Sequence, residues 1–218
     1  MPADQDAGRS PLPPDLARLL HDVRGPLNSL TMHLQVLERL AAADAIAGDS
    51  LRTAQEQLAR LADMLPAVFA LAALEPGPLR RIDLGAVMEA ARDRAGGPVT
   101  LANTAWPAVM GDEALLTLAV GHLLANAVEA TPAGRPWPMV SATAAGAETL
   151  VEVRDWGTGL PVTEPRLLIR LLHSSKGRHR GLGLVTVDRV ARLHHGALRF
   201  ESAAEGGAAV TLALPSAV

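Results

Sequence analysis

The chain contains no cysteine and no tyrosine, and only three tryptophans and two phenylalanines among its 218 residues. The absence of cysteine excludes disulfides and thiolate metal sites. With aromatic residues at 2%, the core has to be built from leucine, valine and alanine, a composition that suits closely packed helices. The formal charge is also small, −3 from 20 Lys plus Arg against 23 Asp plus Glu. Such a charge excludes a mainly electrostatic binder of nucleic acid or membranes.

Long hydrophobic runs are missing as well. The longest apolar run with a helical pattern, residues 65–74, is far shorter than the roughly 20 residues that span a bilayer. No basic-then-apolar signal segment opens the chain. Apolar residues nevertheless make up 49% of the sequence, too many for a disordered chain. We therefore expect a soluble, cytoplasmic protein of one large domain or two small ones, with no nucleic-acid or membrane partner.

Residues 15–74 carry two apolar stripes at coiled-coil spacing. After a flexible, Pro-rich segment over residues 1–14 and a predicted N-cap at Asp15, apolar residues recur at alternating intervals of 4 and 3. A second stripe runs from Leu51 to Val68, with residues 44–50 as the expected connection. This pattern predicts an antiparallel helical hairpin. Because one hairpin cannot cover its own stripe, we expect a homodimer through residues 15–74 that forms a four-helix bundle.

The pattern changes after Glu75-Pro76-Gly77-Pro78, which predicts a linker over residues 75–78. Residues 79–218 mix helices with strands and predict an α+β layer domain. The expected helices start at the caps Asp83 and Asp112, with ends near residues 95 and 130, and a third helix over 184–195 ends on a left-handed Gly196. The expected strands cover residues 99–102, 139–145, 149–154, 198–202 and 210–214.

The first candidate site is the stretch His21-Asp22-Val23-Arg24-Gly25-Pro26-Leu27. If Leu20 occupies heptad position a, His21 faces solvent, where a neutral imidazole is a usable nucleophile. Asp22 can hold the imidazole tautomer or accept its proton. Gly25 and Pro26 cost about 1 and about 3 kcal/mol inside a helix, which predicts a bend next to the histidine. Taken alone, the stretch favours a simpler interpretation, a surface histidine on a kinked helix.

The second candidate site is a polar stripe on the helix after Asp112. It consists of His122, Asn126 and Glu129, spaced by 4 and 3 residues. The simpler interpretation is a stripe that faces water. Because Asn126 lies within a strongly apolar segment, we expect it to need a partner, which a bound cation could supply.

Two glycine-containing stretches predict a ligand-binding loop and a phosphate site. Asp155-Trp156-Gly157-Thr158-Gly159 follows a strand, and there a carboxylate can accept a hydrogen bond from an exocyclic amine while glycine lets the backbone approach a ligand. Gly181-Leu182-Gly183-Leu184 opens a helix, whose N–H groups and dipole favour phosphate. Taken alone, the first stretch is also a common turn and the second is weak evidence for a site.

The loop between these stretches is basic, and most of the histidines have no evident role. The loop's five cations predict a lid over a polyphosphate, although a solvated loop is the simpler interpretation; they are Arg166, Arg170, Lys176, Arg178 and Arg180. The histidines other than His21 lack metal-ligand spacing, and we expect most of them at the surface or in the lid. The two that follow each other, His194 and His195, are expected to point to different sides of one helix.

In this order the four stretches resemble the boxes of two-component sensor histidine kinases. Residues 21–27 resemble the H box, 123–127 the N box, 155–159 the G1 box and 181–184 the G2 box, and the resemblance covers roughly residues 15–215. It implies a dimerisation and histidine-phosphotransfer hairpin over residues 15–74. An ATP-binding domain of the Bergerat type would follow over residues 79–218, an α/β sandwich whose mixed sheet is covered by helices.

The resemblance also implies a reaction and a set of site residues. His21 would take the γ-phosphoryl group of ATP and pass it to an aspartate of a response-regulator receiver domain, with Asp22 beside it. Asn126 would hold Mg²⁺, and Asp155 would bind the adenine amine. The other residues implied at the nucleotide are Gly157, Gly159, Lys176, Arg180, Gly181 and Gly183.

Three departures from the family pattern leave two other functions open. The lid carries Leu167–Leu172 where the family has a Phe-rich box, Gly25 stands where it often has Thr or Asn, and no sensor domain fits before Asp15. We therefore expect that the signal arrives through a separate sensor protein or that the chain is shortened. One alternative is a phosphotransfer adaptor that does not use ATP. The other is an ATP-hydrolysing switch of the gyrase kind, although His122 stands where those proteins have a glutamate base.

Overall fold

The computed structural model describes residues 14–40, 45–160, 182–203 and 205–217. Contacts within the chain divide it into two compact units, residues 1–74 and 75–218. The described residues of the first unit form two helices, and those of the second unit combine helices with strands.

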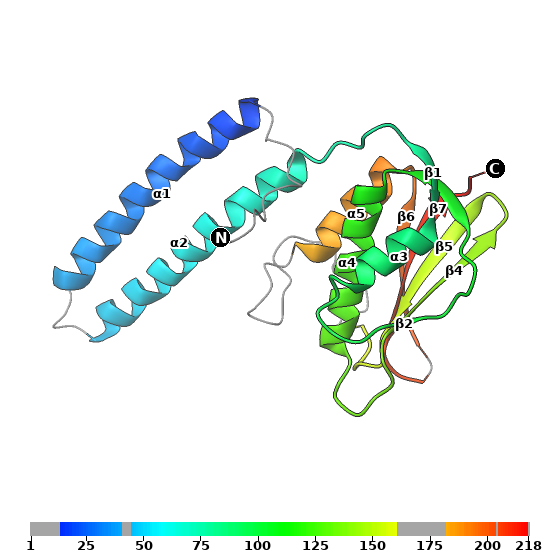
Figure 1. The fold of residues 1–218 in the computed structure, drawn as a ribbon. Helices are drawn as coiled ribbons and strands as arrows, with labels where there is room; N and C mark the ends of the chain where they lie inside the picture. Colours follow the sequence, from blue (N-terminus) through cyan, green and yellow to red (C-terminus); the bar gives the residue numbers. More distant parts are fainter. Residues whose placement is uncertain (1–13, 41–44, 161–181, 204, 218) are drawn as a thin grey trace, which may run out of the picture. The chain divides into compact units, whose positions relative to one another are not determined.

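The first unit is a hairpin of two long helices, α1 (Pro14–Leu40) and α2 (Ala45–Ala72), which pack side by side in opposite directions (Figure 1). Leu20 on α1 and Leu58 and Met64 on α2 are buried. The predicted helical hairpin is therefore confirmed. Helix α1 continues through Gly25 and Pro26, and α2 also contains a proline, Pro66.

Two helix starts differ from the prediction. Helix α1 begins at Pro14, so Asp15 lies inside its first turn instead of preceding it as the N-cap, and proline suits a first helical position. Helix α2 begins at Ala45, so residues 45–50 are helical and do not form a connection. Gly48 costs a helix only about 1 kcal/mol. The same turns are supported by an Arg52–Asp49 ion pair at 2.9 Å and a 3.0 Å hydrogen bond from the Thr53 hydroxyl to the Asp49 carbonyl.

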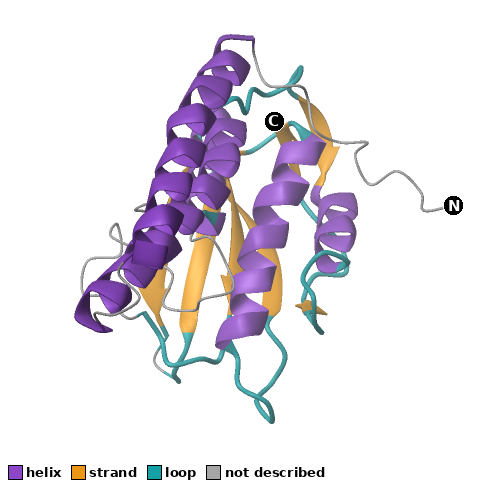
Figure 2. Ribbon diagram, turned by 90° about the vertical axis from the view of Figure 1, so that its left-hand side faces the viewer, coloured by secondary structure: helices purple, strands orange, loops and turns teal. Residues whose placement is uncertain are grey.

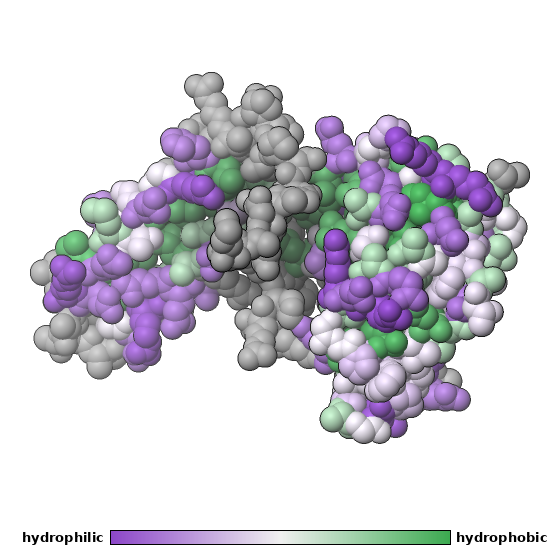
Figure 3. All heavy atoms as spheres, viewed as in Figure 1, coloured by the Kyte–Doolittle hydropathy of each residue, from purple (hydrophilic) through white to green (hydrophobic). Residues whose placement is uncertain are grey.

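Many apolar side chains of this single hairpin remain in contact with solvent. Half or more of the surface of Leu30, Met32, Val36, Leu37 and Leu61 is exposed. Figure 3 shows hydrophobic and hydrophilic side chains together on the surface of this unit. Packing between α1 and α2 therefore covers only part of the apolar stripes.

The second unit is built on a mixed five-stranded sheet with the strand order β2-β4-β5-β7-β6. Strand β2 pairs parallel to β4, and the other neighbours are antiparallel. The bounds are β2 Thr100–Leu101, β4 Met139–Ala145, β5 Glu148–Arg154, β6 Ala197–Ser202 and β7 Ala208–Pro215. These bounds agree with the predicted strands to within two residues, so the sequence pattern located every strand of this sheet.

Three helices, α3 (Leu84–Arg92), α4 (Glu113–Ala130) and α5 (Gly183–Leu193), cover one face of this sheet (Figures 1 and 2). Strand β5 alternates between buried and half-buried residues, so Val151 and Val153 face the helices while Glu152 and Arg154 lie on the opposite face. The α/β sandwich predicted from the resemblance is confirmed.

The caps of α3 and α4 are as predicted, whereas α3 ends earlier than predicted. The carboxylate of Asp83 accepts a hydrogen bond from the N–H of Gly85, and that of Asp112 from the N–H of Leu115. Helix α3 ends at Arg92, three residues before the expected end. The glycine pair after it includes Gly96 at φ +73°, a conformation that does not continue a helix.

The end of α5 differs from the prediction in an informative way. The left-handed residue is His195, at φ +56°, and Gly196 does not have a positive φ. Gly196 is required for a different reason, because a Cβ atom there would overlap the carbonyl oxygen of Ala213 on β7. The glycine therefore permits close packing of the helix end on the sheet.

A small antiparallel sheet of β1 (Arg80–Asp83) and β3 (Ala108–Gly111) was not predicted. Strand β1 has only one apolar residue, Ile82, so it shows no alternation that sequence analysis could detect. Residue Val109 forms a bridge to Ser216, which follows β7.

Helix α4 is the one helix in the described part of the chain that is long and apolar enough to cross a membrane. Its buried residues pack in the second unit, where α4 contacts α3, α5 and β5. A core helix of a domain passes the same test of length and composition.

Candidate functional site

Helix α4 presents its polar residues away from the core. Leu116, Leu123 and Leu124 are buried, whereas Asn126 and Glu129 are exposed and His122 is half-buried. Because the amide of Asn126 reaches solvent, water can also satisfy it, and its role at a bound cation stays a prediction. Among the residues that the structure describes, no group of three or more His, Asp or Glu could hold a metal ion by itself.

The first residue of α5, Gly183, lies against this polar stripe. A Cβ atom on Gly183 would be 3.7 Å from Nδ2 of Asn126 and 3.7 Å from Nδ1 of His122. No side chain caps the start of α5 at Leu182. The N–H groups of its first turn and the positive end of its dipole therefore lie beside the amide of Asn126, an arrangement that suits an anionic ligand.

The side chain of Asp155 is held in place by two backbone groups. Its Oδ1 accepts hydrogen bonds from the N–H of Gly157 at 2.8 Å and the N–H of Ala208 at 3.1 Å. Its own N–H donates to the carbonyl of Ala208 at 2.9 Å. Within the described part of the chain, Oδ2 has no hydrogen-bond partner. The carboxylate is thus fixed by one oxygen and has the other available for a ligand.

The glycine-containing loop after Asp155 packs on the C-terminal end of α4. A Cβ atom on Gly157 would lie 2.6 Å from the carbonyl oxygen of Ala130, so only glycine fits there. The N–H of Trp156 donates to the hydroxyl of Thr131 at 3.3 Å. Gly159 adopts φ +84°, which favours glycine. The structure thereby connects the loop of Asp155 to the helix of Asn126.

His21 is exposed on α1 of the first unit, as its predicted heptad position requires. The next residue, Asp22, belongs to the same helix. Lys176, Arg180 and Gly181, together with the rest of the predicted lid, lie outside the described residues.

Most of the histidines were expected at the surface or in the lid, but His194 is buried, with only 1% of its surface exposed. Its Nε2 accepts a hydrogen bond from the N–H of Asp112 at 2.9 Å, and its Nδ1 lies 2.8 Å from the carbonyl of Val190. A carbonyl can only accept, so these partners assign a neutral ring with the proton on Nδ1. The sequence contained a signal for this burial, because His194 continues the apolar spacing of Val187, Val190 and Ala191.

Asp112 connects this buried histidine to the linker. While Oδ1 of Asp112 caps α4, Oδ2 accepts a hydrogen bond from the N–H of Gly77 at 2.8 Å. Burial alone raises the pKa of Asp112, but hydrogen bonds from the N–H groups of Leu115, Gly77 and Ala114 outweigh it and lower the pKa below the ordinary value of an aspartate.

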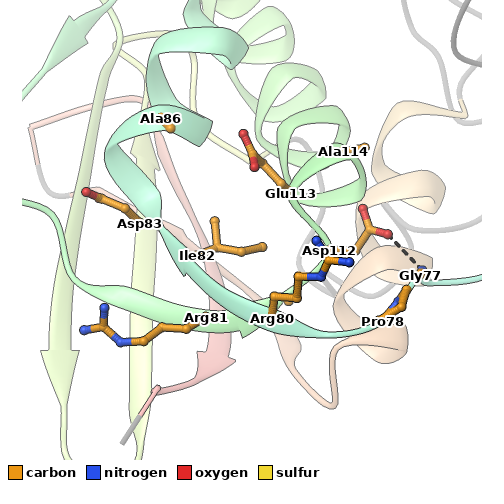
Figure 4. Close-up of a pocket in the computed structure, with 11 residues that line it drawn as sticks. Gly77, Pro78, Arg80, Arg81, Ile82, Asp83, Ala86, Asp112, Glu113 and Ala114 are labelled. Atoms are coloured by element: carbon orange, nitrogen blue, oxygen red, sulfur yellow. Dashed lines mark hydrogen bonds between the residues drawn. The ribbon is translucent and has the colours of Figure 1, made fainter.

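A cavity of about 460 Å³ lies beside the linker (Figure 4), and none of the residues predicted to bind nucleotide lines it. Figure 4 shows the side chains of Arg80, Ile82 and Glu113 among the residues that line it. Its walls come from the linker, β1, and the first turns of α3 and α4, and its lining residues are Gly77, Pro78, Arg80, Arg81, Ile82, Asp83, Ala86, Gly111, Asp112, Glu113 and Ala114. The motif residues on α4, α5 and the Asp155 loop therefore remain the candidate site.

Comparisons with known proteins show which family the second unit resembles. Residues 111–218 match the family of histidine kinase-, DNA gyrase B- and HSP90-like ATPases. The sensor-like histidine kinase SenX3 of Mycolicibacterium smegmatis is 29% identical over 92% of the chain, and the sensor-type histidine kinase PrrB of Mycobacterium leprae is 31% identical over 88%. The chain spans about half the length of these relatives, 56% and 45% respectively.

Solved structures show the same fold. The ATP-binding domain of PrrB from Mycobacterium tuberculosis is 28% identical, with a TM-score of 0.53, and the match covers all of that domain and 65% of this chain. Full-length ShkA in complex with AMPPNP shares the fold over 95% of this chain and 47% of its own length, with a TM-score of 0.63 at 24% identity.

Fold and site together define the second unit as a histidine kinase-like ATPase domain. The helical hairpin precedes this domain in the sequence, and the chain as a whole is similar to the catalytic cores of two-component histidine kinases. The resemblance inferred from the four sequence boxes is confirmed.

Proposed function

We propose that this protein is an ATP-dependent histidine autokinase, which phosphorylates its own His21 and passes the phosphoryl group to an aspartate of a response regulator. The observation that carries the proposal is the paired arrangement in the second unit. Asp155 has a fixed carboxylate with one available oxygen, and the uncapped start of α5 lies against Asn126. These two features match the two ends of an adenine nucleotide.

Each part of the nucleotide has a group of fitting chemistry. Oδ2 of Asp155 accepts the hydrogen bond of the adenine amine. The N–H groups at the start of α5 bind phosphate oxygens, which are negatively charged. The amide oxygen of Asn126, which is exposed, suits Mg²⁺, because this ion usually combines one or two protein oxygens with water and substrate phosphates. When bound, Mg²⁺ neutralises charge on the phosphates.

The phosphoryl step needs a nucleophile and in-line geometry more than elaborate acid–base groups. A nitrogen of the neutral His21 ring forms a bond to the γ-phosphorus, while the bond from phosphorus to the bridging oxygen of ADP breaks and ADP leaves. Asp22, one residue further on α1, holds the imidazole tautomer or accepts the ring proton.

The hairpin also supports a proposal for assembly and location. The half-exposed Leu30 and Leu37 belong to the predicted apolar stripe of α1, so a second copy of the hairpin would cover them in a four-helix bundle. We assign dimerisation and phosphotransfer to residues 15–74, ATP binding to residues 79–218 and the link to residues 75–78. The dimer would act in the cytoplasm, where response regulators and a separate sensor protein can reach it.

The test is incubation of the chain with γ-labelled ATP and Mg²⁺. We expect acid-labile label on the wild-type protein, no label on His21→Ala, and strongly reduced label on Asn126→Ala. His33→Ala is the matched control, since His33 is an exposed histidine of the same helix. A wild-type protein without label would favour the adaptor function, and steady ATP turnover that survives His21→Ala would favour the hydrolytic switch.

A further inference from the structure

Arg154, the last residue of β5, bridges two segments that flank Asp155. Its side chain lies on the face of the sheet opposite the helices. Nη2 donates to the carbonyl of Gly206 in the β6–β7 turn at 3.2 Å. The guanidinium carbon also lies 5.5 Å from the centre of the Trp156 ring, within the range of a cation–π interaction. One side chain thus contacts both the loop after Asp155 and a turn about 50 residues later in the chain.

The turn between β6 and β7 determines the orientation of the Asp155 carboxylate. A Cβ atom on Gly207 would overlap the carbonyl oxygen of Asp155, so the two backbones lie too close together for any side chain at position 207. The next residue, Ala208, exchanges hydrogen bonds with Asp155 through both its N–H and its carbonyl. Any displacement of the turn therefore moves the donor that fixes Oδ1 of the carboxylate.

The position of Arg154 is itself constrained. Its Nε is buried without a hydrogen-bond partner among the described residues. A buried N–H group without a partner costs about 1–3 kcal/mol relative to one that is exposed to water. The contacts with Gly206 and Trp156 offset this cost and hold the guanidinium between the two segments.

We propose that Arg154 is a positioning residue for the adenine-binding carboxylate of Asp155. It acts from the back of the sheet by holding the Gly206–Gly207 turn and Trp156 together, and it does not touch the nucleotide. This inference rests on the proposed ATP site. Loss of the bridge lets Asp155 tilt, which weakens the hydrogen bond to the exocyclic amine of adenine. Guanine does not present that amine, so binding of a guanine nucleotide does not depend on Arg154.

The experiment measures the affinity of the full chain for a non-hydrolysable ATP analogue and for the matching GTP analogue, both with Mg²⁺. For Arg154→Met we expect about tenfold weaker binding of the ATP analogue with little change for the GTP analogue, so the preference for adenine falls by the same factor. Arg154→Lys keeps the cation over Trp156 but loses the planar fork, and should restore part of the preference.

Arg199→Met is the matched control, because Arg199 lies on the same sheet and pairs with Glu148 at 2.8 Å, away from Asp155. It should keep the wild-type preference. If Arg154→Met folds and keeps the wild-type preference for adenine over guanine, the positioning role is overturned. If Arg154→Met does not fold, a wild-type adenine preference in Arg154→Lys overturns it instead. If the wild-type chain binds no ATP analogue, or if Asp155→Asn keeps its adenine preference, the proposed function fails and the positioning role fails with it.

Discussion

The N–H of Asp112 donates to Nε2 of the buried His194 at 2.9 Å, and this bond joins the start of α4 to the end of α5. The same two helices carry Asn126 and Gly183, which lie together at the candidate phosphate site. A part-buried hydrogen bond therefore joins the two helices at one end, and Asn126 and Gly183 lie further along them. Because the carboxylate of Asp112 also accepts a hydrogen bond from the N–H of Gly77, the linker is connected to the same pair of helices.

Replacement of the buried histidine should destabilise the second unit. His194→Ala leaves the N–H of Asp112 without its acceptor and creates a cavity, so we expect a loss of about 2–4 kcal/mol in the free energy of unfolding. Denaturation followed by tryptophan fluorescence measures it, since all three tryptophans lie in residues 75–218. Arg92→Ala, at the end of α3, removes only surface ion pairs with Glu89 and Asp93 and should change the stability by at most about 0.5 kcal/mol. Equal effects of the two variants would show that the buried hydrogen bonds of His194 contribute nothing.

The stability of the second unit should depend on pH through Asp112. Because its pKa is lowered by folding, the ionised carboxylate stabilises the folded state. This contribution is complete above the pKa of the unfolded chain and is lost as the pH falls through the lower folded-state pKa. Asp112→Asn should therefore lower the stability at neutral pH and flatten its decline in acid. Parallel stability curves of the two proteins between neutral and acidic pH would contradict this role.

The end of α5 offers a test of which residue needs to be glycine. His195→Gly should be neutral or raise the stability by up to about 1 kcal/mol, because glycine adopts the left-handed conformation without strain. Gly196→Ala should be strongly destabilising, since the added methyl group would overlap the Ala213 carbonyl. Thermal denaturation separates the two outcomes. A tolerated Gly196→Ala would refute the close packing of this turn on β7.

The proposed dimer should depend on the exposed stripe of α1. Replacing both Leu30 and Leu37 by lysine places charges where the second hairpin would pack, and we expect a monomer with folded helices. Sedimentation measures the mass, and circular dichroism measures the helix content. Glu38→Lys is the charge control and should remain dimeric. A monomeric wild-type chain at micromolar concentration would contradict the assembly.

The sequence predicted features that depend on local chemistry. The caps Asp83 and Asp112 and the polar position of Asn126 follow from residues within one or two helical turns. Likewise, β4 and β5 have the alternation that marks a half-buried strand. The order of the four boxes then indicated the resemblance to two-component histidine kinases.

Features that depend on distant partners were missed. Strand β1 is defined only by its pairing with β3, because its own residues are mostly charged. The bonds from Asp112 to His194 and from Arg154 to Gly206 join residues 82 and 52 positions apart. Gly196 was predicted as the left-handed end of a helix, but glycine is needed there because the backbone lies close to β7. That approach is a tertiary contact, which the local pattern does not contain.

The most direct test of the central claim is to locate the phosphoryl group after the full chain has reacted with ATP and Mg²⁺. Peptide mapping by mass spectrometry under neutral or alkaline conditions preserves a phosphohistidine. We predict a single phosphoryl group on the peptide that contains His21, and the same result for His33→Ala. A phosphoryl group on another residue, or an unmodified chain that still binds ATP, would contradict the account.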